Sequence, residues 1–403
     1  MESIYTDTIV AEPVPVKELE EELSRILGYW EHTAFDRKRN RFYGAVSHLD
    51  IPDDKAPLGI VMYSRILWAF SAASTYTGSP DYLRMADQAW EDIVRYFEDP
   101  EWGAVIWSVT AEGRPGDTKK QLYGIAFCIY ALAEYYRIKK EPAILAKAIT
   151  YYRLIEQYGL EKEYNGYVEA FTRDWKPLGD LRLSEKDNNE RKTMNTHLHI
   201  VEAYANLYSV WPDAELQERI INLLRLFDRY FIDQETGHLR LFFNDEWECR
   251  SRLISYGHDI EAAWLLPYCA GQAGLGELQK KFNAYASRLA EAAARGLDGD
   301  GGLWYEFDPI TSQLIREKHS WPQAEALPGF LHVWKLTGEE KYLKKIRSSW
   351  NFIRTYLSDP VSGEWFWGIH ADYTVIKKDK AGFWKCPYHN TRAILSLLRF
   401  NEK

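Results

Sequence analysis

The sequence predicts an all-α protein, an (α/α)6 barrel of twelve helices with short β-hairpins in the loops at one end. The main observation is an internal repeat, because a short turn-plus-strand segment recurs at intervals of about 60 to 70 residues. Each interval leaves about 45 residues between these segments, which is room for two helices of ordinary length. The six segments centre on Gly44, Gly103, Gly166, Gly237, Gly302 and Gly363.

The stretches between the glycines have the apolar periodicity of helices, for example residues 123–136 and 220–231. Six helical hairpins can close into a ring with an inner and an outer layer, whereas an open solenoid needs distinct polar caps at its ends. We therefore expect a closed double ring with a funnel at its centre. Because no linker rich in proline, glycine or serine divides the chain, residues 16–403 are predicted to form one domain, preceded by a loose arm over residues 1–15.

Composition limits the classes of partner. The chain has 403 residues and a net charge of -9, which disfavours nucleic acid and anionic membranes and suits a neutral small molecule. No segment approaches the roughly 18 to 20 apolar residues of a membrane span, and the acidic start lacks the features of a secretory signal. The four cysteines are far apart and form no metal-type pair, so a reducing, cytoplasmic location is the simplest prediction.

Aromatic residues make up 15% of the chain, with 16 tryptophans and 27 tyrosines. Aromatic faces stack on the C–H faces of sugar rings, so a cleft lined by tryptophan would suit a carbohydrate. The alternative is that these side chains pack the core of a large helical protein. Composition alone leaves both interpretations open.

The first of three histidine segments covers residues 194–204. Asn195, His199 and Glu202 recur at helical spacing and form a polar stripe beside an apolar one, whereas His197 falls off this stripe. The alternative for His199 is a structural histidine. A metal site is disfavoured, because helical residues two apart point in different directions.

The other two histidine segments both start helices. His258 and Glu261 are three residues apart on one helical face, where the carboxylate can orient the imidazole and raise its basicity. His389 follows Pro387 at the start of the last predicted helix, whose positive end lowers the pKa of the imidazole below its usual value of about 6.5. The alternative for each is a residue that only bonds the start of its helix.

Two further residues are candidates for ligand contacts. Arg65 lies in an apolar helical segment, where a guanidinium needs a carboxylate or a polar ligand oxygen, and Trp321 lies in the segment 320–326, directly before a proline. A structural ion pair is the alternative for Arg65. The glycine-rich segment 271–276 follows no strand, so it fits no phosphate loop, and no dinucleotide fingerprint is present.

Taken together and in order, these segments resemble the N-acylglucosamine 2-epimerase superfamily, in particular its members that act on cellobiose. The resemblance covers nearly the whole chain and depends on residues 64–68, 194–199, 255–262, 321–326, 363–365 and 384–390. It implies that His258 and His389 are an acid/base pair, with His199 as a third essential histidine. It further implies that the sugar is held by Arg65, Tyr123, Asn195, Glu261, Trp321, Trp384 and Asp187.

The activity implied by the resemblance is reversible inversion at carbon 2 of the reducing-end aldose of a β-1,4-linked disaccharide, without metal or other cofactor, by a monomer or weak homodimer. One departure is visible: Ser320 precedes Trp321 where members that act on cellobiose commonly have two adjacent tryptophans. A mannose 2-epimerase and an aldose–ketose isomerase therefore stay open as alternatives. A glycosidase on the same fold, which needs two carboxylates such as Glu261 and Glu325, and a non-catalytic sugar-binding module are more distant ones.

Overall fold

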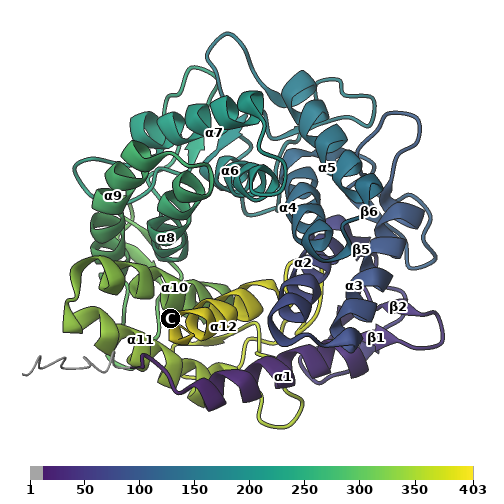
Figure 1. Cartoon of the computed structure of the whole chain (residues 1–403). Coiled ribbons are helices and arrows are strands. Elements are labelled where there is room, and N and C mark those ends of the chain that lie inside the picture. Colours follow the sequence, from purple (N-terminus) through teal and green to yellow (C-terminus); the bar gives the residue numbers. More distant parts are fainter. Residues whose placement is uncertain (1–11, 403) are drawn as a thin grey trace, which may run out of the picture.

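Within residues 12–402, the part of the chain that the computed structural model describes, twelve α-helices form two concentric rings (Figure 1). The inner ring consists of α2 (Ile60–Thr77), α4 (Leu122–Lys139), α6 (Met194–Tyr208), α8 (Tyr256–Gln272), α10 (Ser320–Thr337) and α12 (Tyr388–Asn401). The outer ring consists of α1 (Val16–His32), α3 (Pro80–Asp92), α5 (Pro142–Leu154), α7 (Ala214–Leu226), α9 (Gly276–Ala294) and α11 (Glu340–Phe352). The predicted helical content and helix number are confirmed.

Packing between neighbours closes the inner ring. Each inner helix contacts the next one along the chain, and α12 returns to contact α2. Each of α2, α4, α6, α8 and α10 also packs against the outer helix that follows it, while α1 packs against α12. The chain therefore forms helical hairpins whose first and last elements lie side by side (Figure 1).

The two rings differ in how their helices are buried. Inner helices are apolar on nearly all sides, and α2 is buried without a break from Ile60 to Ser74. Outer helices are amphipathic, since α3 buries only Met85, Ala86, Ala89 and Asp92. A helix enclosed by neighbours on every side needs apolar residues all round, whereas an outer helix needs only one apolar stripe. The sequence of each helix thus decides its ring.

Short antiparallel strand pairs join the repeats at one end of the rings. Only three pairs are local: β1 (Phe35–Asp36) with β2 (Arg41–Phe42), β3 (Ala45–Val46) with β4 (Pro52–Asp53), and β12 (Glu306–Asp308) with β13 (Gln313–Ile315). The others link successive repeats: β5 (Leu58–Gly59) with β6 (Ser108–Val109), β7 (Lys120–Gln121) with β8 (Ala170–Phe171), β9 (Lys192–Thr193) with β10 (Phe242–Phe243), β11 (Ile254–Ser255) with β12, and β14 (Glu317–His319) with β15 (Gly368–His370). The predicted short strands are present, but most pair across repeats instead of forming hairpins.

This arrangement positions the inner helices. Each of β5, β7, β9, β11 and β14 ends directly before an inner helix, so the N-terminal ends of these helices gather beside the strand pairs. Three of the strands carry a buried lysine two residues before the helix, and we call these the strand lysines. They are Lys120, Lys192 and Lys318, and each bonds a carboxylate in the loop after an outer helix.

Four outer helices end in a five-residue π-helical turn. These turns are η1 (Ile93–Phe97), η2 (Ile155–Gly159), η3 (Phe227–Phe231) and η4 (Ile353–Leu357). A tyrosine in each of the last three stacks on an aromatic residue held at positive φ, as in Tyr230 over Trp247 with ring centroids 4.4 Å apart. In the first repeat Gly113 takes that position, and a Cβ there would lie 2.4 Å from Tyr96. The repeat inferred from glycine spacing is therefore also a repeat of turn geometry.

The predicted loose arm over residues 1–15 falls mostly on residues 1–11, which lie outside the described part of the chain. The remaining residues are attached to the rings. Val14 is buried in the core, and Arg347 donates hydrogen bonds to the carbonyl oxygens of Glu12 and Pro13. Among the helices of residues 12–402, none combines the length and apolarity needed to cross a membrane.

Candidate active site

All ten site residues named from the sequence line a single cavity of about 760 Å³. Eight of them lie in the first two turns of inner helices, and most occupy the second or sixth residue of the helix. The exceptions are Asp187, in the loop between β8 and β9, and Trp384, in the loop before α12. The ten are Arg65, Tyr123, Asp187, Asn195, His199, His258, Glu261, Trp321, Trp384 and His389.

The N-terminal ends of six helices therefore converge on this cavity. Each end carries backbone N–H groups without a partner inside the helix and a partial positive charge, which stabilise negative charge and disfavour positive charge nearby. A pocket surrounded in this way is suited to a reaction that develops an anion.

Two histidines meet the same tryptophan in the cavity. The ring centroid of His258 lies 4.8 Å from that of Trp321, and the centroid of His389 lies 5.8 Å from it. The separation of the two imidazoles cannot exceed the sum of these distances, which one sugar ring with its hydroxyl groups can span. Both imidazoles can thus reach the same ligand in the cavity.

Both imidazoles are uncharged at neutral pH. Burial lowers the pKa of His258 to about 3, and the nearby His199 and Lys186 act in the same direction. Burial likewise lowers the pKa of His389 to about 3, although Glu325 opposes this shift. Burial also lowers the pKa of His199. A neutral imidazole can accept a proton, so each ring can act as a base.

The partners of the histidines differ from the sequence-based interpretation. Glu261 does not contact His258; the Nδ1 atom of His258 instead lies 2.8 Å from the hydroxyl of Ser255. Glu261 is directed to Arg392, which donates to it at 2.8 Å. Helical spacing put the two side chains on one face correctly, but a buried guanidinium attracts a carboxylate more strongly than a neutral imidazole does.

The other two histidines do have carboxylate partners. The Nδ1 atom of His199 lies 2.8 Å from Glu202, and that of His389 lies 2.7 Å from Glu325. A carboxylate on Nδ1 places the proton on that atom and leaves Nε2 to accept one. The pairing of His199 with Glu202 follows from their spacing in α6, whereas Glu325 reaches His389 from another helix.

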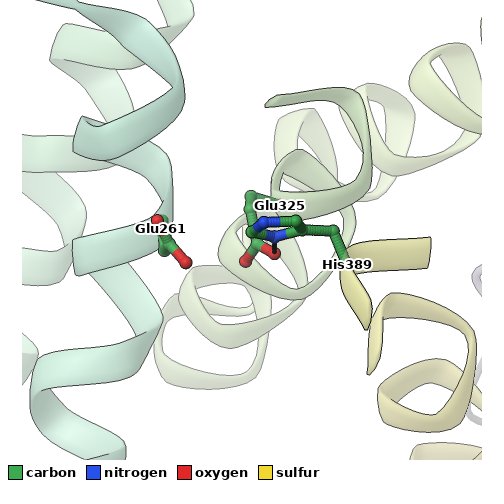
Figure 2. Close-up of side chains that lie close together, drawn as sticks. All are labelled: Glu261, Glu325 and His389. Carbon is green, nitrogen blue, oxygen red and sulfur yellow. Dashed lines mark hydrogen bonds and ion pairs between the residues drawn. The ribbon is translucent and has the colours of Figure 1, made fainter. Parts of the chain in front are cut away.

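Figure 2 shows Glu261, Glu325 and His389 directed toward one another from α8, α10 and α12. Their potential ligand atoms all lie within 4.8 Å of one another, a separation that a metal ion could bridge. Arg392 donates hydrogen bonds to both carboxylates, at 2.8 and 2.7 Å. A guanidinium thus already balances part of the negative charge of this group.

The same contacts bear on the glycosidase alternative. Glu325 is fully buried and accepts hydrogen bonds from Trp264 and Arg392 in addition to its contact with His389. Glu261 and Glu325 share one guanidinium nitrogen. Carboxylates that cleave a glycosidic bond must flank it with their oxygens free to reach the substrate. This pair does not have that arrangement.

Arg65 is a buried cation that lines the cavity. It donates to the hydroxyl of Tyr123 at 2.7 Å and lies 4.3 Å from the ring centroid of Phe127. Within residues 12–402 it forms no ion pair with a carboxylate, and its Nε has no partner. The ion pair considered from the sequence is absent there, which favours a ligand oxygen as the partner of this guanidinium.

Aromatic residues both pack the core and line the cavity, the two roles that the composition left open. Trp30 and Trp365 are fully buried in the core, whereas Trp321 and Trp384 line the cavity. Trp384 packs near Tyr123, with ring centroids 5.9 Å apart. The cavity thus offers flat apolar surfaces beside polar groups, as carbohydrate sites do.

One cavity residue, Glu169, had no clear signal in the sequence, whereas Asp187 and His197 were considered there. Glu169 lines the cavity and accepts hydrogen bonds from the hydroxyls of Thr193 and Thr196, and burial raises its pKa to about 7. Asp187 lines the cavity too, but its carboxylate bonds Ser184 of its own loop. His197, which falls off the polar stripe, is buried against Thr193 and Tyr167 and lines no part of the cavity.

An all-helical double ring whose central cavity holds neutral, oriented histidines and tryptophan surfaces defines a class of proteins that move protons on a sugar. Comparison with known proteins gives the family. The model of the N-acylglucosamine 2-epimerase family matches residues 42–393, and the chain belongs to this family.

Individual relatives agree with this assignment. The chain is 42% identical over 384 residues to the cellobiose 2-epimerase of Bacteroides fragilis, covering 95% of this chain and 98% of that protein. The solved structure of cellobiose 2-epimerase from Bacillus thermoamylovorans is 36% identical, covers 96% of this chain and 99% of its own, and superposes with a TM-score of 0.91. A solved D-mannose isomerase, 19% identical with a TM-score of 0.82, shares the fold.

Proposed function

We propose that the protein is a cellobiose 2-epimerase, an isomerase that reversibly inverts carbon 2 of the reducing-end aldose of β-1,4-linked disaccharides such as cellobiose and lactose. The observation that carries the proposal is the pair of neutral imidazoles, His258 and His389, on one sugar-sized cavity. The extent of similarity to cellobiose 2-epimerases supports the choice of substrate.

The reaction begins by opening the sugar ring, because the hydrogen on carbon 2 is acidic only beside a carbonyl. The proton leaves the hydroxyl on carbon 1, the bond from carbon 1 to the ring oxygen breaks, and the ring oxygen takes up a proton. His199, held by Glu202, assists this exchange or polarises the resulting carbonyl oxygen.

Inversion then moves one proton. One imidazole of the pair removes the proton from carbon 2, and the electron pair of that bond forms the carbon 1–carbon 2 double bond of a cis-enediolate. Arg65 and the converging helix ends stabilise its negative charge. The other imidazole, which has first taken up a proton from water, returns it to the opposite face, and the carbonyl forms again. The first imidazole then gives its proton to water, so both rings end uncharged. The net change is redox-neutral, so the chemistry calls for no cofactor.

The remaining cavity residues hold the sugar. Trp321 and Trp384 offer their faces to its C–H surfaces, and Arg65, Tyr123 and Asn195 offer polar atoms to its oxygens. The Oδ1 atom of Asn195 is buried without a partner, which suits a sugar hydroxyl as its donor. Asp187 shapes the loop that closes one side of the cavity, and Glu261 contributes its second oxygen.

We assign residues 16–403 to one catalytic domain with the (α/α)6-barrel fold. The closed circle of inner-helix contacts and the single apolar core that runs through both rings support this assignment. We further place the protein in the cytoplasm as a monomer or weak homodimer. The four cysteines, which are all free, support a reducing compartment.

Product analysis in heavy water tests the proposal. The protein is incubated separately with cellobiose, lactose, mannose and glucose, and products are identified by chromatography and NMR. We expect the disaccharides to yield their C2 epimers with deuterium at carbon 2. Conversion of mannose and glucose alone would indicate a mannose 2-epimerase, a ketose product would indicate an isomerase, and release of monosaccharide would indicate a glycosidase. Binding without isotope exchange would indicate a non-catalytic module.

A further inference from the structure

Arg392 lies behind residues that line the cavity and contacts three carboxylates from three different helices. It lies one helical turn after His389 in α12 and is almost fully buried. One guanidinium nitrogen donates to Glu202 and to the hydroxyl of Tyr388, and the other donates to Glu261 and Glu325. Arg392 is not among the site residues predicted from the sequence, and no step of the proposed reaction uses it directly.

Two of these carboxylates hold cavity histidines. Glu202 contacts Nδ1 of His199 through one oxygen while its other oxygen accepts from Arg392. Glu325 contacts Nδ1 of His389 through the same oxygen that accepts from Arg392. The guanidinium of Arg392 therefore bonds the carboxylate of both histidine–carboxylate pairs.

We propose that Arg392 is a positioning residue for the epimerisation: its guanidinium fixes Glu202 and Glu325 in the geometry in which they orient His199 and His389. The inference rests on the proposed epimerase function. A histidine can receive a proton from the substrate only if its Nε2 is unprotonated and faces the cavity, and a fixed, ionised carboxylate on Nδ1 ensures this.

The physical reason is the balance of buried charge. Burial and the nearby Glu325 raise the pKa of Glu261 to about 8 even beside Arg392. Without this cation, Glu202 and Glu325 would also take up protons or turn away. A protonated Glu325 would donate a hydrogen bond to Nδ1 instead of accepting one, which would move the proton of His389 to Nε2. The base would then be blocked at the atom that faces the substrate.

Among the charged and titratable groups near Arg392, no other cation bonds these carboxylates within the described chain. These groups are Tyr130 from α4, Glu202 from α6, Glu261 and Cys269 from α8, Glu325 from α10, and Tyr388 from α12. Arg65 from α2 lies nearby, since the Tyr388 ring centroid is 5.1 Å from its guanidinium and 4.4 Å from that of Arg392. Arg65 makes no hydrogen bond to Glu202 or Glu325 within the described chain, so it cannot replace Arg392.

The positive charge of Arg392 also acts on the histidines directly. Burial is the main cause of the low pKa of His389 and of His199, and Arg392 lowers both further. Removing this charge raises the pKa of each imidazole toward its usual value. The acidic limb of the pH profile of kcat/KM then moves toward neutral pH, because the base is lost to protonation earlier as pH falls.

The test compares Arg392→Met with Arg219→Met in the full-length protein. Arg219 lies on the outer helix α7, where it forms an ion pair with Glu156. It lines no part of the cavity. We expect Arg392→Met to lower kcat/KM on the epimerised sugar by about 100-fold, mainly through kcat, and to move the acidic limb up by about one pH unit. Arg219→Met lowers the melting temperature but leaves the pH profile unchanged. An unchanged profile in Arg392→Met would overturn the inference.

A second measurement needs no activity. In protein labelled with ¹⁵N-histidine, the ring shifts of His199 and His389, assigned with single variants, report which nitrogen carries the proton. We expect Nδ1–H in the wild type and loss of that form in Arg392→Met. Should that variant not fold, Arg392→Lys serves instead, because an ammonium keeps the charge but cannot bridge the same carboxylates. Retention of Nδ1–H at both histidines in the folded variant contradicts the inference, even if the wild type fails to epimerise any sugar.

Discussion

The strand lysines and Arg392 are both buried cations, but they meet acidic groups in different ways. Each strand lysine bonds a carboxylate in the loop after an outer helix, as Lys120 does with Asp99 at 2.9 Å, in addition to the carbonyl of Gly103. The same contact recurs at Lys192 and Lys318. Arg392 instead faces three carboxylates, and this arrangement occurs once in the described chain.

The difference indicates which buried charges belong to the scaffold. A contact that recurs at the same place in successive repeats fixes the strand that precedes an inner helix, and no titratable group of the cavity depends on it. The arrangement around Arg392 breaks the repeat, gathers more carboxylates than it can neutralise fully and ends on histidines. We therefore expect the charge of Arg392 to affect turnover, and the charges of the strand lysines to affect only stability.

The largest effect is expected from the histidines at the centre. His389→Gln should lower kcat for cellobiose or lactose epimerisation by at least about 10³-fold, because a positioned acid/base group is lost while its volume is largely retained. Isotope exchange at carbon 2 in heavy water measures this. His332→Gln, outside the cavity, is the matched control and should keep its activity. Deuterium incorporation retained in both His389→Gln and His258→Gln would exclude them as the acid/base pair.

The central histidines should also make stability depend on pH. The pKa of His258 is about 3 in the folded chain and about 6.5 when exposed, so its contribution to stability is complete above pH 6.5 and is lost as pH falls toward 3. The free energy of unfolding should therefore fall by on the order of 4 kcal/mol for this histidine over that range. Urea unfolding at several pH values measures the slope, which should be shallower in His258→Gln. Equal slopes would show that this imidazole is not buried uncharged.

A strand lysine should behave differently. Lys120→Met should destabilise the fold by about 3 kcal/mol, the lower end of the range for breaking a buried pair, because Arg173 still binds Asp99. Its pH profile of kcat/KM should match that of the wild type. Denaturant unfolding and steady-state kinetics on the same sample test both statements. A shifted profile would remove the distinction between the two kinds of buried cation.

The smallest effect is expected at the residue that ends an inner helix, which differs from one repeat to the next. The inner helices α2 and α10 end in Gly78 and Gly338 at positive φ, whereas α4 ends in Lys140 at φ 54°. Lys140→Gly should stabilise the fold by about 0.5 to 1 kcal/mol, since glycine adopts this conformation without strain. Thermal unfolding measures the gain, and kinetics should stay unchanged. A loss of stability would mean that the lysine side chain contributes more than its backbone costs.

Much of this arrangement could be read from the sequence, because the repeat of glycine turns and apolar helices defines both rings. The positions of His199, His258 and His389 at helix starts also brought them to one cavity, since the inner helices share one direction. What could not be read is which carboxylate meets which histidine. Glu325 and Arg392 reach their partners from separate helices, and such contacts depend on side-chain packing across the ring. Local spacing therefore gave the wrong partner for His258.

The convergence of helix N-termini on the cavity bears on inhibition. A flat, negatively charged analogue, such as a hydroxamate that copies carbons 1 and 2, would meet six partial positive charges and Arg65 at once. The corresponding sugar alcohol has the same hydroxyl groups but gains nothing from that field. Selective inhibitors of this fold are therefore to be sought among planar acids and not among closer copies of the sugar.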